Sequence, residues 1–349
     1  MGADFEMTDF HGGNIYKYKD YLDFSANINP LGMPDSVRRA VIQSAELWEK
    51  YPDPDCTKLT GKIAEKENIS APHIVCGNGA DDIICRIIGS FRPKKALVSV
   101  PTFSEYSRIL SENNCKIHKY FLEEKNSFYV MSDIVEYINE KTDMIFLCSP
   151  NNPTGNTISP EIMQIIAEKC LYTNTILVCD ECFMDFVIDS KNKTSRNFLN
   201  KNMIIIKAFT KIYAMAGLRL GYGVFGDSEI AEKVRRNGQY WSVSVPAQEA
   251  GISALDETDY INKTLNYIEK ERNFLTNELS GMKFKVFPSE ANFIFFRSNI
   301  PVEELLKKQK ILIRNCENYG IDKNFFRIAV RTHDENIMLI SALRRILNG

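Results

Sequence analysis

The sequence lacks any long hydrophobic run and any excess of charge of one sign. No apolar run approaches the ~20 residues that a membrane-spanning helix needs, so we expect no transmembrane segment. Lys and Arg total 43 and Asp and Glu total 45, a balance that offers no basic surface to nucleic acid or to an anionic membrane. The first residues, MGADFEMTDF, have neither the basic segment nor the apolar core of a signal peptide, so we expect a cytoplasmic protein.

Paired cysteines are also scarce. The nine cysteines are scattered along the chain, which fits reduced thiols in a cytoplasm better than a disulfide framework. Cys179 and Cys182 have the C-x-x-C spacing of a redox or zinc motif. No second pair completes a zinc site, and this motif ends an apolar run, whereas redox pairs open a helix. We therefore expect no metal site.

Strand-length apolar runs alternate with helical patterns between residues 45 and 245, after an arm rich in Gly, Asn and Pro. The clearest runs are residues 96–100, 144–148, 175–179 and 203–207. Continuous apolar runs of this length are typical of strands that are buried on both faces of a sheet. The pattern predicts an α/β fold, with a large, mostly parallel sheet wound between helices.

The pattern changes after about residue 250, where strands and helices no longer alternate strictly. We expect helices at residues 260–279 and 334–347, and short strands at residues 283–287, 292–297, 311–314 and 325–330. This order is typical of a smaller α+β domain. The predicted domains are an N-terminal arm with part of the small domain, the large domain, and the small C-terminal domain, at residues 1–44, 45–248 and 249–349.

Four polar segments lie at or just after the ends of predicted strands, where ligands bind in open α/β sheets. They are residues 77–82, 149–155, 179–182 and 209–221. In the first, Gly79, Ala80 and Asp81 open a predicted helix, and backbone N–H groups there can hold a phosphate. The segment does not satisfy G-x-G-x-x-G, which argues against a dinucleotide. A plain capped helix is the alternative interpretation.

The other three segments each carry a side chain suited to chemistry. An amide such as that of Asn152 can bind a ligand oxygen, although SPNNPTG is also an ordinary turn sequence. Asp180 can hold a cationic ring nitrogen, or it can cap a helix. Lys211, flanked by apolar residues, is a candidate for a desolvated amine that forms Schiff bases, and Arg219 suits a phosphate. Most lysines, however, lie at the surface.

Together and in this order, these segments resemble the fold type I enzymes that use pyridoxal 5'-phosphate (PLP), specifically aminotransferase classes I and II. The resemblance covers nearly the whole chain and implies a homodimer. It implies that Lys211 holds PLP as a Schiff base and that Asp180 pairs with the pyridine nitrogen. It further implies the following contacts: Asn152 with the ring oxygen, Phe103 on the ring face, Gly79, Ala80, Asp81, Thr210 and Arg219 with the phosphate, Tyr51 with the phosphate across a dimer interface, and Arg327 with the substrate carboxylate.

Within this family, the sequence resembles the threonine-phosphate decarboxylases of cobalamin biosynthesis and the histidinol-phosphate aminotransferases. Stretches such as HGGNI and DFSANINPLG are more similar to the decarboxylases, and they imply that His11 and Asn27, with Arg331, contact a substrate phosphate. The aminotransferases usually carry Tyr three residues after the ring aspartate, where this chain has Phe183. The expected function is therefore PLP-dependent decarboxylation of L-threonine O-3-phosphate, with an aminotransferase as the alternative.

Two non-enzymatic classes fit the sequence less well. A regulator built on this fold carries an added DNA-binding domain, for which 349 residues leave no room. A catalytically dead binding module is expected to lose Lys211, Asp180 or Arg219, and this chain keeps all three. We therefore expect a small phosphorylated amino acid as the substrate and no nucleic-acid or membrane partner.

Overall fold

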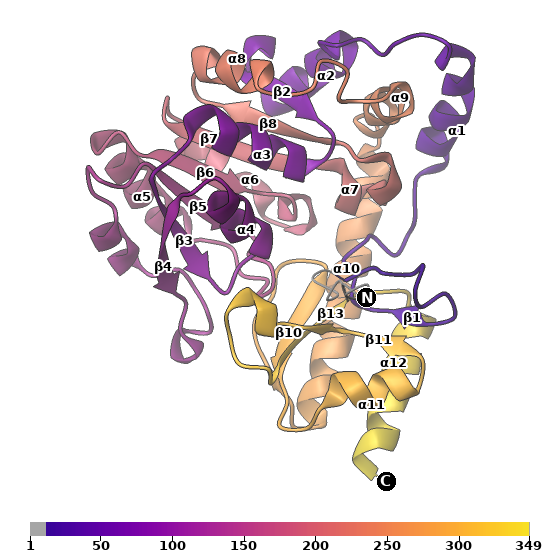
Figure 1. Ribbon diagram of the computed structural model, residues 1–349. Helices are drawn as coiled ribbons and strands as arrows, with labels where there is room; N and C mark the ends of the chain where they lie inside the picture. The colour runs from indigo at the N-terminus through magenta and orange to yellow at the C-terminus, as the bar shows by residue number, and fades with distance from the viewer. Residues whose placement is uncertain (1–11, 349) are drawn as a thin grey trace, which may run out of the picture.

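The computed structural model describes residues 12–348, which form two sheets with helices around them and a short two-stranded pairing. Figure 1 shows the larger sheet and its helices in the upper part of the molecule and the smaller sheet in the lower part. The long helix α10 (Thr258–Gly281) runs from one part into the other. The strand β1 (Leu22–Asp23) of the N-terminal arm and the C-terminal helix α12 (His333–Asn348) both lie on the side of the smaller sheet.

The larger sheet has seven strands in the order β2-β8-β7-β6-β5-β3-β4. All strands run parallel except β8, which is antiparallel to both of its neighbours. The strands are β2 (Ile74–Gly77), β3 (Lys95–Val100), β4 (Lys116–Phe121), β5 (Met144–Cys148), β6 (Ile176–Asp180), β7 (Met203–Ala208) and β8 (Gly221–Phe225). The predicted mostly parallel sheet is thus present.

Helices cover both faces of this sheet, and each face has its own hydrophobic cluster. One cluster packs isoleucines of α3 and the Tyr106 ring of α4 against residues such as Phe146 and Ile204. The other includes Leu147 and Ile205, which point to the opposite face because side chains alternate along a strand. The helices of this part are α1 (Asp35–Gln43), α2 (Thr57–Glu67), α3 (Ala80–Phe91), α4 (Ser104–Glu112), α5 (Pro160–Tyr172), α6 (Ser190–Lys193), α7 (Phe209–Ile212), α8 (Ser228–Arg236) and α9 (Val245–Ala254).

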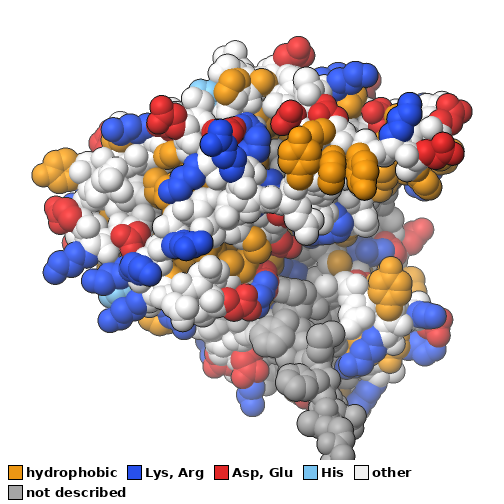
Figure 2. Space-filling view, turned by 45° about the horizontal axis from the view of Figure 1, so that its top comes forward, with side chains coloured by type: hydrophobic (Ala, Val, Ile, Leu, Met, Phe, Trp, Pro, Cys, Tyr) orange, Lys and Arg blue, Asp and Glu red, His pale blue; other side chains and the backbone are white. Residues whose placement is uncertain are grey.

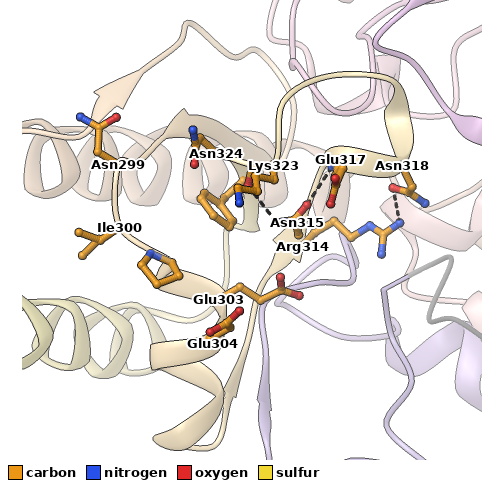
Figure 3. Close-up of a pocket in the computed structure, with 12 residues that line it drawn as sticks. Asn299, Ile300, Glu303, Glu304, Arg314, Asn315, Glu317, Asn318, Lys323 and Asn324 are labelled. Atoms are coloured by element: carbon orange, nitrogen blue, oxygen red, sulfur yellow. Dashed lines mark hydrogen bonds between the residues drawn. The ribbon is translucent and has the colours of Figure 1, made fainter.

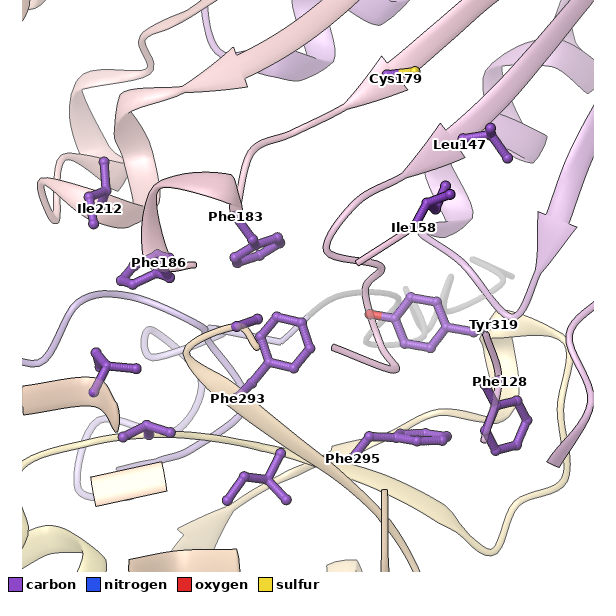
Figure 4. Packing of buried hydrophobic residues seen from close by; sticks show 14 of the residues in the cluster. Phe128, Leu147, Ile158, Cys179, Phe183, Phe186, Ile212, Phe293, Phe295 and Tyr319 are labelled. Atoms are coloured by element: carbon purple, nitrogen blue, oxygen red, sulfur yellow. The ribbon is translucent and has the colours of Figure 1, made fainter. Parts of the chain in front are cut away.

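The smaller sheet is antiparallel, in the order β12-β13-β10-β9. Its strands are β9 (Lys285–Val286), β10 (Phe293–Arg297), β12 (Arg314–Asn315) and β13 (Phe325–Ala329), and α10, α11 (Val302–Lys308) and α12 (His333–Asn348) pack with it. Aromatic residues fill the space between the sheets, as Figure 4 shows. The ring of Phe183 meets that of Phe293 edge to face, with 5.1 Å between the centroids. This contact joins a loop of the larger sheet to β10.

One predicted strand, residues 311–314, is two strands in the structure. Ile311–Leu312 (β11) pairs in parallel with β1 (Leu22–Asp23) of the N-terminal arm, whereas β12 pairs with β13. The run crosses from one pairing to the other at Ile313, and an apolar run alone does not reveal a change of partner. The sequence also missed β4, because this edge strand is mostly exposed and shows no apolar run.

Membrane insertion through a helix finds no support in the part of the chain that the structure describes. Among residues 12–348, no helix is both long enough and apolar enough to cross a bilayer.

Candidate active site

A cavity of about 310 Å³ opens at the carboxyl ends of β5, β6 and β7, where the two sheets meet. Residues from the N-terminal arm, the larger sheet and the smaller sheet all line it. Ten predicted site residues lie here: Asn27, Ala80, Asp81, Phe103, Asn152, Asp180, Thr210, Lys211, Arg219 and Arg327. Residues separated by up to 300 positions in the sequence therefore converge on one cavity, as ligand binding requires.

Three predicted residues are placed differently. Gly79 does not line the cavity but packs against Arg219, which does. Tyr51 is exposed, and its ring stacks on Trp241 at 4.2 Å, so it does not reach the cavity of its own chain. Arg331 forms an ion pair with Glu335 at 2.7 Å and does not line the cavity. His11 lies outside the described residues.

The start of α3 forms a cradle for an anion. Gly79 caps this helix with φ of +85°, and a Cβ atom built there would lie 2.7 Å from Nη2 of Arg219. Arg219 itself has φ of +58°. Its Nη2 atom lies 3.6 Å from Oδ2 of Asp81. The helix N-terminus and the guanidinium thus face the same space, and both favour negative charge. A phosphate group fits this cradle.

Asp180 ends β6 and is buried, with one donor on each carboxylate oxygen. The backbone N–H of Cys182 donates to Oδ1 at 2.9 Å, and the phenol of Tyr106 donates to Oδ2 at 2.5 Å. Burial, followed by the charge of Asp180, raises the pKa of Tyr106 well above its usual range, so the phenol stays a donor. Tyr106 was not among the residues predicted from the sequence. Its signal was the position of a tyrosine one helical turn after Phe103 at the start of α4.

The pKa values of the two lysines near the end of β7 are shifted in opposite directions. Lys207 pairs with Glu67 at 3.1 Å, and although burial opposes it, the surrounding carboxylates raise the pKa of Lys207. Burial, assisted by the positive charge of Arg327, lowers the pKa of Lys211, which faces the cavity. A lowered pKa increases the fraction of neutral amine, the form that attacks a carbonyl carbon. Lys211 is therefore the lysine suited to hold an aldehyde.

Arg327 connects the two parts of the molecule across the cavity. This buried arginine of β13 donates through Nη1 to Oδ1 of Asn152 and through Nη2 to the carbonyl of Ser25 at 2.6 Å. The Tyr319 hydroxyl lies 3.5 Å from Nη1. The buried Nε atom of Arg327 has no hydrogen-bond partner within the described residues. The sequence did not reveal Ser25 and Tyr319, because a backbone acceptor and a lone tyrosine form no motif.

Asn27 brings a buried side-chain amide to the same cavity. Its Oδ1 atom has no hydrogen-bond partner within residues 12–348, whereas its backbone carbonyl accepts from the Asn292 amide at 3.1 Å. Buried polar groups are normally paired, so an unpaired one in a cavity points to a missing ligand.

The residues of this cavity fit PLP by their chemistry. The Gly79 cradle would accept its phosphate, and the Lys211 amine would react with its aldehyde. Asp180 makes no ion pair within the part of the chain that the structure describes, although an uncompensated buried carboxylate is costly. The pyridine nitrogen of PLP, when protonated, would supply a compensating positive charge beside Asp180.

A larger cavity of about 790 Å³ lies on the smaller sheet, beside α11 (Figure 3). Polar residues such as Glu303, Arg314 and Asn318 line it, with 2.8 Å between Nη2 of Arg314 and Oδ1 of Asn318. None of the predicted cofactor residues that the structure describes lines this cavity. Size alone therefore does not locate the candidate active site.

The fold and the cavity define a PLP-dependent enzyme of fold type I. The family model "Aminotransferase class I and II" matches residues 19–343, and the chain belongs to this family. Membership confirms the predicted fold class and PLP as the cofactor.

Relatives of two activities align with most of the chain. A threonine-phosphate decarboxylase of Salmonella typhimurium is 35% identical over 97% of each chain. Histidinol-phosphate aminotransferase 2 of Archaeoglobus fulgidus is 32% identical over 94% of each chain. Among solved structures, the histidinol-phosphate aminotransferase from Clostridium acetobutylicum superposes with a TM-score of 0.88 at 31% identity, covering 94% of this chain and 99% of that one.

Proposed function

We propose that this enzyme decarboxylates L-threonine O-3-phosphate to 1-aminopropan-2-yl phosphate, a step of cobalamin biosynthesis. The similarity to a threonine-phosphate decarboxylase over 97% of both chains carries the proposal. Phe183 supports it. This residue lines the cavity three positions after Asp180, where the aminotransferases usually offer a tyrosine hydroxyl. The edge of its ring packs on Phe293, so the cavity wall here is apolar.

The cavity residues divide the work of the reaction. When bound, PLP supplies an electron sink for the bond that breaks at the substrate Cα. The Arg327 guanidinium, fixed by Asn152 and the Ser25 carbonyl, holds the substrate carboxylate. Asp180 keeps the pyridine nitrogen protonated, and Tyr106 and the Cys182 amide fix the direction of that carboxylate.

Lys211 carries the proton. After the bond between Cα and the carboxylate breaks and carbon dioxide leaves, the Lys211 ammonium donates a proton to Cα. The lowered pKa of Lys211 suits this task, because the amine gains and loses a proton more readily than an exposed lysine. In a transaminase, the same amine moves the Cα proton instead.

The substrate phosphate provides binding energy away from the reacting bond, which can hold the carboxylate in the reactive orientation. We propose that Asn27 and His11, with Arg331, bind this phosphate. Asn27 lines the cavity, and the Nδ2 group of its amide is a donor for phosphate oxygens, whereas Arg331 is engaged by Glu335 and would have to change partner.

An aminotransferase, such as one acting on histidinol phosphate, is the second candidate. The 31% identity to a solved histidinol-phosphate aminotransferase over 94% of this chain favours it. Both reactions use the same cofactor contacts, so Lys211, Asp180 and Arg219 do not distinguish them. The two candidates differ in which bond at Cα is broken.

A homodimer completes the proposal, with Tyr51 reaching the cofactor phosphate of the partner subunit. The exposed ring of Trp241 contacts two other exposed rings. Its centroid lies 4.2 Å from that of Tyr51 and 5.0 Å from that of Tyr240. Exposed hydrophobic side chains stand side by side on the face shown in Figure 2. An apolar group of this kind is typical of an interface.

Product analysis tests the function. The PLP-loaded protein is given L-threonine O-3-phosphate, and carbon dioxide and aminopropanol phosphate are quantified. In parallel it receives histidinol phosphate and 2-oxoglutarate, and glutamate is measured. The proposal requires stoichiometric carbon dioxide without glutamate, and a Lys211→Ala variant without turnover. Glutamate without carbon dioxide would establish the aminotransferase instead.

A further inference from the structure

Two cysteines that lie twenty positions apart in the sequence meet beneath the start of α2. Cys56 is the N-cap residue of that helix, and Cys76 lies on β2. Both line a cavity of about 200 Å³ that is separate from the candidate active site. Cys56 is buried, whereas Cys76 is partly exposed to the cavity. A small oxidant that enters the cavity can therefore reach Cys76.

Thr60 contacts both cysteines, and its backbone N–H donates to the carbonyl of Cys56 at 2.7 Å. The Thr60 hydroxyl lies 3.6 Å from the Cys76 sulfur, a second contact that holds this side chain in place. Cys56 has φ of +49°, the left-handed conformation that a residue with a Cβ rarely adopts. The fold thus brings both cysteines to one residue, Thr60, beside the same cavity.

Charged groups around the pair treat the two thiols differently. The hydrogen bond from Cys56, then Thr60, Arg235 and Arg86, lower the pKa of Cys76 although burial opposes them. The same hydrogen bond and burial raise the pKa of Cys56, to which Asp53 adds. The arginines are themselves paired: Arg86 with Asp82 at 2.6 Å, and Arg235 with Glu232. Cys76 is thereby the more nucleophilic of the two.

We propose that Cys56 and Cys76 form a redox-active pair that a hydroperoxide converts into a disulfide. The Cys76 thiolate attacks one peroxide oxygen, the O–O bond breaks, and water or an alcohol leaves, so that Cys76 carries a sulfenic acid. The Cys56 sulfur then attacks that of Cys76, the S–O bond breaks, and the hydroxyl leaves as water. The two thiols lose two electrons and the peroxide gains them. A thiol reductant reverses the reaction.

The bond connects two segments that matter for the proposed function. Cys56 follows Tyr51 by five positions, and Cys76 precedes Gly79 by three. Closing a bond of about 2.05 Å draws α2 and β2 together. We therefore infer that oxidation speeds the release of PLP. This second part rests on the proposed roles of Tyr51 and Gly79 in holding the phosphate, whereas disulfide formation does not.

Peptide mapping tests the bond. The holoprotein is treated with hydrogen peroxide, its remaining thiols are alkylated, and it is digested with trypsin. The expected product joins residues 51–58 to residues 67–86, lacks two hydrogen atoms, and disappears after dithiothreitol. Because the second peptide also contains the exposed Cys85, Cys85→Ser is the matched control and must retain the product. Cys56→Ser and Cys76→Ser must lose it.

Two results decide the two parts separately. Absence of this peptide from wild-type protein, or its survival in Cys76→Ser, overturns the disulfide. For the second part, release of PLP is followed by its visible absorbance after gel filtration. We expect faster release from oxidised wild type than from reduced wild type, and no change in Cys56→Ser. Equal release from a fully cross-linked sample overturns the coupling and leaves the disulfide standing.

Discussion

The phenol of Tyr106 donates a hydrogen bond to the carboxylate of Asp180, with 2.5 Å between Oη and Oδ2. Tyr106 is fully buried, and its ring stacks on Phe146 at 5.1 Å, so the hydroxyl has little freedom to turn away. This hydrogen bond fixes the orientation of the Asp180 carboxylate. A helix on one face of the sheet thus orients a residue at the end of the central strand β6.

Replacement of Tyr106 by Phe removes this donor and keeps the ring packing. A hydrogen bond to a charged group contributes about 1.5–3 kcal/mol, so we expect the apoprotein to lose roughly that much free energy of unfolding. The deficit should shrink when PLP is bound, because the ring nitrogen then compensates the carboxylate. Denaturant unfolding with and without PLP measures both quantities.

Tyr120→Phe is the matched control for that experiment. Its hydroxyl donates to Asp133, also at 2.5 Å, away from the cavity. Its deficit should be the same with and without PLP. An equal deficit in both states for Tyr106→Phe would mean that Asp180 does not face the cofactor.

Gly79→Ala should weaken PLP binding by on the order of tenfold or more. Its backbone, with φ of +85° and ψ of 170°, lies in a region open essentially to glycine alone, where strain is about 1–3 kcal/mol. The added methyl group would also displace the Arg219 guanidinium, 2.7 Å away. About 1.4 kcal/mol corresponds to tenfold in affinity. Equilibrium titration of the apoprotein with PLP measures the change.

Gly61→Ala provides the comparison for this substitution. Gly61 lies within α2, and no atom lies within 4 Å of the added Cβ. Alanine there should leave PLP binding unchanged and stabilise the helix by about 0.5–1 kcal/mol. Similar PLP affinity for both variants would remove the start of α3 as the phosphate site.

Lys211→Met should stabilise the apoprotein most near neutral pH. Because the folded pKa of Lys211 is lowered from 10.5, the folded protein binds fewer protons than the unfolded chain between these two pKa values. Wild-type stability therefore gains from this group as pH rises through that window. The advantage of the methionine variant should shrink as pH approaches 10.5. An advantage independent of pH would show that Lys211 is not desolvated.

Phe183→Tyr places a hydroxyl donor in the apolar wall of the cavity. A donor to the ring oxygen stabilises its anionic form and lowers the proton affinity of the nearby nitrogen of the Lys211 link. We expect the pH midpoint of the visible absorbance change to fall in the holoprotein, and any transamination to rise relative to decarboxylation. An unchanged midpoint would mean that residue 183 does not approach the ring oxygen.

The sequence predicted four strands of the larger sheet, β3, β5, β6 and β7, because their residues are almost all buried and apolar. Residues 144–148 match β5. The run at 175–179 begins and ends one residue before β6, and the run at 203–207 ends one residue before β7 does. The exposed edge strand β4 leaves no such pattern. The change of partner at Ile313 depends on the N-terminal arm, which is distant in sequence.

Site residues that belong to short motifs were found, and residues that act through others were not. Asn152, Asp180 and Lys211 each follow a strand within a recognisable segment, and the structure brings them to one cavity. The contact of Tyr106 with Asp180 spans 74 positions, and that of Arg327 with the Ser25 carbonyl spans 302. Such contacts follow from tertiary packing, which local sequence patterns do not contain.

The most direct measurement of the proposed function is proton NMR of the reaction with L-threonine O-3-phosphate in deuterium oxide. Decarboxylation followed by protonation at Cα predicts 1-aminopropan-2-yl phosphate with one deuterium on the carbon that bears the nitrogen. The carboxylate carbon should leave in equal amount. Recovered threonine phosphate that has its carboxylate and carries deuterium at Cα, without loss of carbon dioxide, would contradict the account and identify the bond to hydrogen as the one that this enzyme breaks.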